Sequence, residues 1–146
     1  MIIYSDGYTA DSKDDVLIVR KYLRTIKGFR RIEIIERNTN LGLMKSILAG
    51  VTETLSRHDA IIVLEDDLEV SKDFLAFMND ALVFYAPENS VKSVSGYSIG
   101  IEEEASSYFL HRPHSWGWGT WRDRWNEFRE LNPEIQAIIK NKTLDK

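Results

Sequence analysis

The stretch AIIVLEDDLEVSKDF, residues 60–74, joins a short apolar run directly to three adjacent carboxylates. The run at 60–64 has the length and the aliphatic side chains of a strand that is buried on both faces. The carboxylates of Glu65, Asp66 and Asp67 repel one another, so their position at the end of a buried strand needs a physical reason. That reason depends on what the rest of the chain places around them.

Strands and helices alternate along the first two-thirds of the chain. Short apolar runs that end in turn residues predict strands at 2–5, 31–36, 60–64 and 91–95. Amphipathic stretches between them predict three helices, the first capped by Asp11 and ended by Gly28, the second over 43–55, and the third capped by Ser71 and ended before Pro87. The predicted buried stripes are Val16, Val19, Leu23 and Ile26; Leu43, Ile47, Leu48, Val51 and Leu55; and Phe74, Phe77, Met78, Ala81, Leu82 and Tyr85.

This alternation is typical of βαβ units, so we expect an α/β fold with a mostly parallel, Rossmann-like sheet and helices on both faces. Beyond Gly100 the pattern changes: YFLHR (108–112) predicts a short strand and SWGWGTW (115–121) a turn. Thr120 and Asp123 can form a capping box for a helix that begins there. Asn132-Pro133 has the N-cap and N1 residues that begin a last short helix. We expect one domain over residues 1–146.

Composition limits the function. The 146 residues are 43% hydrophobic and 29% charged, as in ordinary globular proteins, and 19 basic against 23 acidic residues give a net charge of −4. No general basic surface for nucleic acid is expected. Without cysteine there are no disulfides or thiolate metal sites. No membrane span or signal peptide is visible, and a cytoplasmic protein is expected.

Polar residues follow each of the four predicted strands at its carboxyl end. In an open parallel sheet these ends lie along one edge, where ligands bind. The strand beginnings carry only ordinary solvated residues, so this asymmetry predicts a binding edge. The polar ends are Ser5-Asp6-Gly7, Arg37-Asn38-Thr39-Asn40, Glu65-Asp66-Asp67 and Ser95-Gly96-Tyr97-Ser98.

A divalent cation would explain the acidic triplet. Oxygen ligands alone suit Mg²⁺ or Mn²⁺, which proteins commonly hold with one or two carboxylates together with substrate phosphates. The alternative is that the acids are merely solvated. Phosphoaspartate receivers and haloacid-type phosphatases also place Asp after a parallel strand, but there it follows the first strand, and YSDG here is not their Asp-x-Asp.

Two other segments carry candidate ligands. RNTNLG (37–42) leads into a helix whose N-terminus suits a phosphate or a sugar hydroxyl, and a solvated loop with an Asn N-cap is the open alternative. Trp116 and Trp118 flank Gly117, so indole faces can stack on a sugar ring where the glycine allows close approach. By their helical spacing Trp121, Trp125 and Phe128 are predicted core residues, and His111 and His114 are predicted structural or acceptor-facing residues rather than zinc ligands.

Taken together, IIYSDG, RNTNLG, VLEDDLEVSKDFLAFM, SVSGYS and SWGWGTW resemble a GT-A fold, nucleotide-sugar-dependent glycosyltransferase. The likeness covers nearly the whole chain and is greatest to the N-acetylglucosaminyltransferase I type and its bacterial sugar-transferase relatives. EDDLEV followed by an apolar helix is its most specific part. The resemblance implies an inverting, Mn²⁺-dependent (or Mg²⁺-dependent) transfer from a nucleotide-sugar, expected to be UDP-linked, to a saccharide acceptor.

The resemblance also implies roles for particular residues. Asp67 would be the metal ligand that bridges to the diphosphate, Asp66 would lie near the ribose, and Glu65 near the donor sugar. Asp6 would face the base, and Asn40 is placed with it in the nucleotide site. Trp116, Gly117 and Trp118 would border the donor sugar and the acceptor.

Two differences from a full GT-A domain lead us to expect a fragment. The strand and helix that come first in the family are not found before IIYSDG, so the first strand is expected to be missing and self-association through the open sheet edge is expected. No catalytic base is evident, and it is expected beyond Lys146. A non-catalytic nucleotide- or sugar-binding module of the same fold is the alternative function. A sugar nucleotidyltransferase would need a Gly-rich basic signature, which is not visible.

Overall fold

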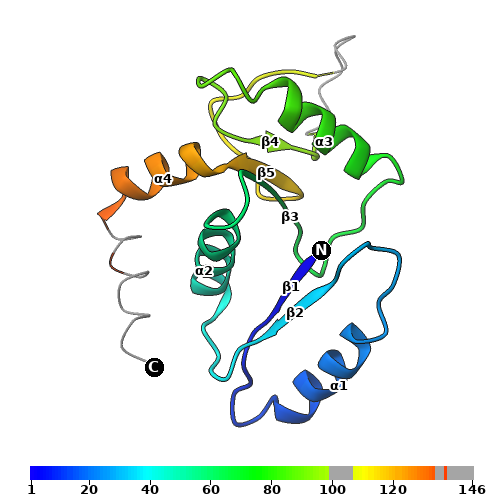
Figure 1. The fold of residues 1–146 in the computed structure, drawn as a ribbon. Coiled ribbons are helices and arrows are strands. Elements are labelled where there is room, and N and C mark those ends of the chain that lie inside the picture. The colour runs from blue at the N-terminus through cyan, green and yellow to red at the C-terminus, as the bar shows by residue number, and fades with distance from the viewer. Residues whose placement is uncertain (99–106, 134–136, 138–146) are drawn as a thin grey trace. The chain divides into compact units, whose positions relative to one another are not determined.

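A computed structural model of the chain describes residues 1–98, 107–133 and 137 (Figure 1). The described residues fall into two compact units, Met1–Gly50 and Val51–Ala137, and each unit is described by itself. Both contain strands and helices, as the α/β prediction requires. That residues 1–146 form a single domain stays a prediction.

The first unit contains a pair of parallel strands, as predicted. β1 (Ile2–Ser5) pairs with β2 (Glu33–Glu36), and the register runs from Ile2 opposite Glu33 to Ser5 opposite Glu36. The helix α1 (Lys13–Leu23) connects the two strands. Because the strands are parallel, the loops that follow them emerge at the same edge of this small sheet.

The inward face of α1 differs from the predicted apolar stripe. The N-cap position is Ser12, not Asp11, and its side chain makes no capping hydrogen bond. Val16 is half-buried, but Val19, predicted as a core residue, is exposed. The charged side chain of Arg20 is buried instead. The prediction was wrong here because the guanidinium finds enough hydrogen-bond acceptors at the ends of β1 and β2 to replace its hydration.

The second helix, α2 (Leu43–Leu55), buries side chains from Leu48 onward. Val51 and Leu55 are buried as predicted, whereas Leu43 at the start of the helix is exposed. A Cβ at Gly50 would lie 3.1 Å from the Tyr4 ring, so the absence of a side chain there lets α2 approach β1 closely. The Tyr4 ring thus packs directly on the backbone of α2 at Gly50.

The second unit is built on three antiparallel strands in the order β3 (Ala60–Val63), β5 (Trp118–Trp121), β4 (Val94–Ser95). β5 runs antiparallel to both neighbours, so β3 and β4 run in the same direction. The prediction of a turn over 115–121 was therefore wrong for its second half. Gly119 allows the pairing, because a Cβ there would lie only 2.9 Å from the carbonyl oxygen of Ile61.

Two further predictions near β5 were wrong. Residues 108–112 form no strand, and Phe109 in this segment is largely exposed with no strand beside it in the described structure. The capping box is not formed: Thr120 lies in β5 and its hydroxyl donates to the carbonyl of Lys92, 2.8 Å away. Asp123 instead pairs with the neighbouring Arg124. Strand pairing placed Thr120 outside the helix and removed its capping role.

The core of this unit lies between α3 (Phe74–Phe84) and the three-stranded sheet. The N-cap position of α3 is Asp73 rather than Ser71, and the Asp73 side chain makes no capping hydrogen bond. Of the predicted stripe, Phe77 is exposed, so that assignment was wrong. The buried cluster consists of Phe74, Met78, Leu82, Val94 and Trp121.

The last described helix, α4 (Arg122–Leu131), is attached to the core by indole rings. The Nε1–H of Trp125 donates to Oγ1 of Thr52 over 3.0 Å, and that of Trp121 donates to the carbonyl of Leu82 over 3.1 Å. Both tryptophans are buried as predicted, whereas Phe128 is exposed on one side and packs on Trp125 with the other. The predicted helix after Asn132 lies mostly outside the described residues.

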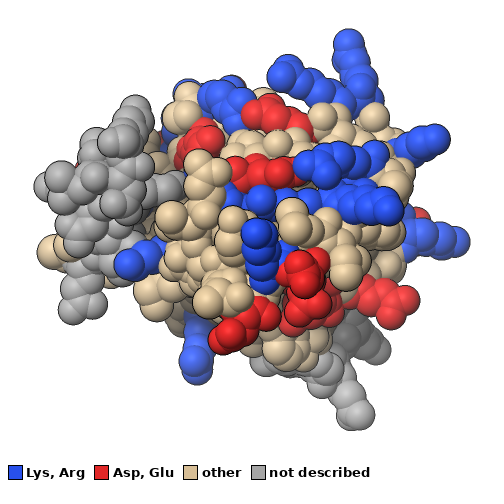
Figure 2. All heavy atoms as spheres, turned by 90° about the horizontal axis from the view of Figure 1, so that it is seen from below, with Lys and Arg blue, Asp and Glu red and all other residues tan. Residues whose placement is uncertain are grey.

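Within the described residues, no helix combines the length and the apolar character needed to cross a membrane. Basic and acidic side chains are interspersed on the face drawn in Figure 2. The absence of a general basic surface stays a prediction. Cytoplasmic localisation and self-association stay predictions.

Candidate functional site

The acidic triplet lies in a turn that directly follows β3. Glu65 is half-buried, whereas Asp66 and Asp67 form the turn and are exposed. The backbone N–H of Leu68 donates to the carbonyl of Glu65 over 3.4 Å and closes the turn. The chain thus presents two adjacent carboxylates to solvent at the end of a half-buried strand.

The chemistry of this turn fits a cation that is shared with a ligand. Neither Asp66 nor Asp67 pairs with a Lys or Arg of the described residues. Among those residues, no group of three or more His, Cys, Asp or Glu side chains is arranged to hold a metal by itself. A hard cation such as Mg²⁺ or Mn²⁺ needs only one or two carboxylates when phosphate oxygens and water complete its shell. The residues present therefore suit that kind of site and not a metal centre made of protein ligands alone.

The glycine–tryptophan segment meets the ends of both neighbouring strands. Trp118 lies opposite Val63 of β3 and opposite Ser95 of β4. The N–H of Gly96 donates to the carbonyl of Gly117 over 2.7 Å. The predicted site residues 65–67 and 116–118 are therefore brought to the same edge of this sheet, as are the residues that follow β4.

Glycine is required at this edge for two reasons. Gly117 has φ of 64°, which an L side chain rarely adopts, and a Cβ there would lie 2.9 Å from the ring of Phe74. At Gly96 a Cβ would come within 2.4 Å of the same ring. Phe74 thus packs directly beneath the two backbones. Phe74, the first residue of α3, therefore supports the sheet edge at which the acid turn lies. We use this name for the turn formed by Glu65, Asp66 and Asp67.

The two tryptophans that were predicted to contact sugar differ in their surroundings. Trp116 is 53% exposed, and its ring packs edge-on against Tyr97 at 4.7 Å between centroids. Tyr97 in turn contacts the His114 ring at 5.5 Å. Trp118 is half-buried and lies against Trp125 at 6.1 Å. Of the pair, Trp116 therefore offers the more open ring.

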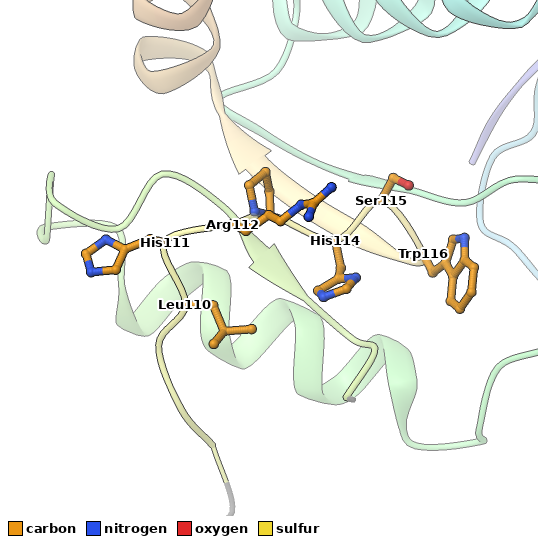
Figure 3. A pocket seen from close by; sticks show the side chains of 7 residues that line it. Leu110, His111, Arg112, His114, Ser115 and Trp116 are labelled. Carbon is orange, nitrogen blue, oxygen red and sulfur yellow. The ribbon is translucent and has the colours of Figure 1, made fainter. Parts of the chain in front are cut away.

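A pocket of about 660 Å³ is lined by residues Leu110–Trp116, and Figure 3 shows the His111 and Trp116 side chains on opposite sides of the view. Its volume lies within the range of about 300–1,000 Å³ that is common for small-molecule sites. The histidines predicted as structural or acceptor-facing residues thus line a hollow beside Trp116. Within the part of the chain that the structure describes, these histidines belong to no group of three or more side chains that could hold a metal ion.

In the first unit, Asp6 and Asn40 join the loops that follow β1 and β2. The Asp6 carboxylate accepts hydrogen bonds of 2.9–3.0 Å from the backbone N–H groups of Gly7, Leu41 and Gly42. The Asn40 amide donates to the carbonyl of Gly7, and its oxygen accepts from Gly42. These contacts give both residues a structural role at the start of α2. Nucleotide binding by Asp6 and Asn40 stays a prediction.

Arg20 is a site-supporting residue that was not among the predicted ones. Its guanidinium donates to Ser5 Oγ at 3.2 Å, to the Asp6 carbonyl at 3.1 Å and to the Arg37 carbonyl at 2.7 Å. It also lies 3.6 Å from the Glu36 carboxylate. The available signal was its spacing, because Val16, Arg20 and Leu23 are i, i+4 and i+7 on one helix face. A basic residue on the inward face of the helix that follows SDG indicates that its side chain binds and holds the SDG loop.

Comparison with protein families identifies the architecture. The model of the family described as "Glycosyl transferase family 2" matches residues 1–140 of the chain. The chain belongs to glycosyl transferase family 2. This membership confirms the Rossmann-like GT-A fold and supports the general prediction of a glycosyltransferase.

Among individual proteins, this family 2 chain is similar to "Protein amnionless" of Drosophila melanogaster, with 27% identity over 84 residues. That similarity spans 56% of the chain and 16% of the length of the Drosophila protein. It is too low in identity and coverage to add to the family assignment. No solved structure matches the chain.

The position of a catalytic base stays a prediction. Within α4, Asp123 lies in the first turn, where its carboxylate contacts Arg124 at 3.2 Å. An acidic side chain in the first turn stabilises a helix through the helix dipole, so this position has a structural explanation. We therefore assign Asp123 no catalytic role.

Proposed function

We propose that the protein transfers a sugar from a UDP-linked donor to a saccharide acceptor, with inversion and with a bound Mn²⁺ or Mg²⁺, as a transferase of the N-acetylglucosaminyltransferase I type. The observation that carries the proposal is the exposed Asp66–Asp67 turn at the end of β3, on the sheet edge that also holds Trp116–Trp118. Family 2 membership supports the sugar-transfer part of the proposal.

In this proposal the three acids have separate roles. Asp67 would hold the cation, Asp66 would accept a hydrogen bond from the ribose, and Glu65, the half-buried acid, would contact the donor sugar. The ion, when bound, neutralises the charge that develops on the departing diphosphate. Two exposed carboxylates side by side are unfavourable without such a counter-charge, which is why the turn supports the proposal.

The other residues of the site would bind and orient the sugars. Trp116 has an open ring for stacking, and Gly117 has no side chain to keep a sugar away from the backbone. Asp6 and Asn40 are proposed to hold the loop that faces the nucleotide. A general base would take the proton from the acceptor hydroxyl.

The test is isothermal titration calorimetry of UDP in the presence and absence of Mn²⁺ on the full-length protein. Asp67→Asn should remove the Mn²⁺-dependent part of UDP binding, because an amide is a neutral and weaker ligand than a carboxylate. Glu69→Gln is the matched control, since Glu69 is an exposed acid of the same loop. Unchanged Mn²⁺-dependent affinity in Asp67→Asn would exclude the proposed metal role.

Turnover separates this proposal from a non-catalytic binding module of the same fold. Release of UDP from UDP-N-acetylglucosamine and other UDP-sugars can be followed with and without saccharide acceptors. Acceptor-dependent release supports the transferase. Tight Mn²⁺-dependent UDP binding without any release from the tested donors would favour the binding module.

A further inference from the structure

A second pocket adjoins the one that ends at Trp116. It measures about 510 Å³ and is lined by Tyr85, Glu88, Ser90, Val91, Phe109, Leu110 and His111. Leu110 and His111 line both pockets, so the two hollows are neighbours along one segment of chain. Of the residues discussed so far as ligand contacts, the second pocket contains His111, which was predicted to be structural or acceptor-facing, and none of the donor or metal residues.

Aromatic side chains form one wall of this second pocket. Phe109 is 72% exposed, although its ring packs against Tyr85 at 5.6 Å between centroids and 85° between planes. The edge-to-face contact orients the Phe109 ring, while most of its surface stays open. An oriented, solvent-exposed ring is well suited to stack on a flat apolar surface of a ligand.

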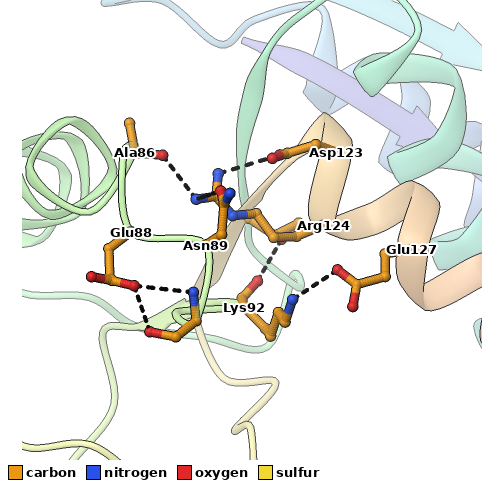
Figure 4. Close-up of polar contacts among 9 residues, drawn as sticks. Ala86, Glu88, Asn89, Lys92, Asp123, Arg124 and Glu127 are labelled. Carbon is orange, nitrogen blue, oxygen red and sulfur yellow. Dashed lines mark hydrogen bonds and ion pairs between the residues drawn. The ribbon is translucent and has the colours of Figure 1, made fainter.

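A fixed carboxylate lies beside this aromatic wall. Ser90 donates to Oε1 of Glu88 through its hydroxyl at 2.7 Å and its backbone N–H at 3.3 Å (Figure 4). Hydrogen bonds from the Ser90 side chain and backbone, followed by the charge of Arg124, hold the pKa of Glu88 below its ordinary value. Oε2 makes no hydrogen bond with the described residues, so it can accept one from a ligand.

The chemistry of the lining selects the ligand class. Among the described residues, no Lys or Arg lines the second pocket. The Glu88 carboxylate is the acidic group in that lining. An anionic ligand such as a phosphate would therefore be repelled. A ligand with an apolar face and several hydroxyl groups matches both the Phe109 ring and the free oxygen of Glu88.

We propose that this second pocket, which we call the distal pocket, binds a neutral sugar residue of the acceptor saccharide, one or more residues away from the sugar that is extended. The inference rests on the proposed glycosyltransferase function. The acceptor would run from the acid turn past Trp116, along Leu110–His111, to Phe109 and Glu88. The transferase would then prefer oligosaccharide acceptors to monosaccharides.

The experiment measures binding of fluorescently labelled neutral oligosaccharides to the full-length protein. The probes are cellotetraose, maltotetraose and tetra-N-acetylchitotetraose, each compared with its disaccharide. At least one tetrasaccharide should bind more tightly than its disaccharide. Phe109→Ala should weaken that tetrasaccharide about tenfold, the usual effect of losing one important contact, and leave the disaccharide unchanged. Glu88→Gln should weaken it in the same direction.

Phe84→Ala is the matched control. Phe84 is 73% exposed, and its ring also packs edge-on against Tyr85, at 4.9 Å, but it does not line the distal pocket. This variant should bind every probe like the wild type. Equal weakening in Phe84→Ala and Phe109→Ala, or no binding of any tetrasaccharide by the wild type, would overturn the proposal.

Failure here is distinguishable from failure of the proposed function. Mn²⁺-dependent UDP binding depends on the acid turn and should be unaffected by Phe109→Ala. A protein that binds UDP with Mn²⁺ and releases it in transfer, but shows no preference for longer saccharides, retains the proposed function without a distal pocket.

Discussion

The backbone N–H of Gly96 donates a 2.7 Å hydrogen bond to the carbonyl of Gly117. This bond links the residues after β4 to the residues before β5, at the edge where the acid turn leaves β3. The ring of Phe74 packs against both glycines, so neither position has room for a side chain. The edge is therefore specified by backbone contacts rather than by interlocking side chains.

Gly117→Ala should destabilise the protein more than a change at another glycine with positive φ. Gly28 has φ of 98° and no atom within 4 Å of the place that a Cβ would take, so Gly28→Ala meets only the backbone penalty of about 1–2 kcal/mol. Gly117→Ala adds a clash with Phe74, typically worth a further ~1–3 kcal/mol. Urea unfolding of the two variants measures the difference. Equal losses would mean that Phe74 can move away freely.

Asp6→Ala should lower stability because the carboxylate accepts from the backbone of the loop before α2. The expected loss is about 1–2 kcal/mol, as for other capping acids, and Asp6→Asn should lose less because it keeps one acceptor oxygen. Asp11→Ala is the control, since Asp11 is exposed and α1 has its N-cap at Ser12. Thermal unfolding checks the order. A stable Asp6→Ala protein that has lost UDP binding would instead support a direct nucleotide contact.

Arg124→Met should cost about 2–4 kcal/mol of unfolding free energy. The buried guanidinium donates to the Ala86 carbonyl at 2.8 Å and to Asn89 at 3.2 Å, and it lies 4.2 Å from the centre of the Trp121 ring. Methionine keeps part of the apolar contact but loses the cation–π contact and the charged hydrogen bonds to Ala86 and Asn89.

Lys92→Met provides the comparison for Arg124, because Lys92 and Glu127 are about half exposed and pair at 2.7 Å (Figure 4). An exposed pair of this kind contributes about 0–1 kcal/mol. Chemical denaturation of both variants should therefore separate them clearly. A loss in Arg124→Met as small as that in Lys92→Met would show that water replaces the guanidinium at Ala86.

Stability should depend on pH through Glu88. Its pKa is lowered from 4.5 chiefly by the side-chain hydrogen bond from Ser90, then by the backbone hydrogen bond. The folded state therefore holds this proton less tightly than the unfolded state. The resulting stabilisation is present above pH 4.5 and is lost as the pH falls through the lowered pKa.

Urea midpoints at about pH 6 and about pH 3 for the wild type and Glu88→Gln test this dependence. The difference between the two proteins should shrink at the lower pH, because protonated Glu and Gln are both neutral. Ser90→Ala should behave like Glu88→Gln in losing the pH-dependent part. A difference that is the same at both pH values would argue against the Ser90 hydrogen bonds as its cause.

Much of the fold could be predicted from local pattern. The alternation of short apolar runs with amphipathic stretches predicted β1, β2, β3, β4 and the helices α1 to α3, because burial of one face imposes a period on the residues of each element. The position of the acid turn could be predicted in the same way, because three carboxylates after an apolar run lie where the chain leaves the core. Two helix starts were predicted at the wrong residue, because the N-cap positions Ser12 and Asp73 form without the side-chain hydrogen bonds that sequence signals assume.

The sequence by itself thus determined the α/β class and the place of the acid turn after β3, because hydrophobic periodicity and charge repulsion act between near neighbours along the chain. Only the tertiary structure decided that 118–121 is a strand, since Gly119 and Trp118 gain their partners from β3 and β4, far away in sequence. The same holds for Arg20, whose buried charge is compensated by three oxygens from the ends of β1 and β2. A residue that depends on distant backbone atoms has no local signature, because its partners are set by how the chain folds back on itself.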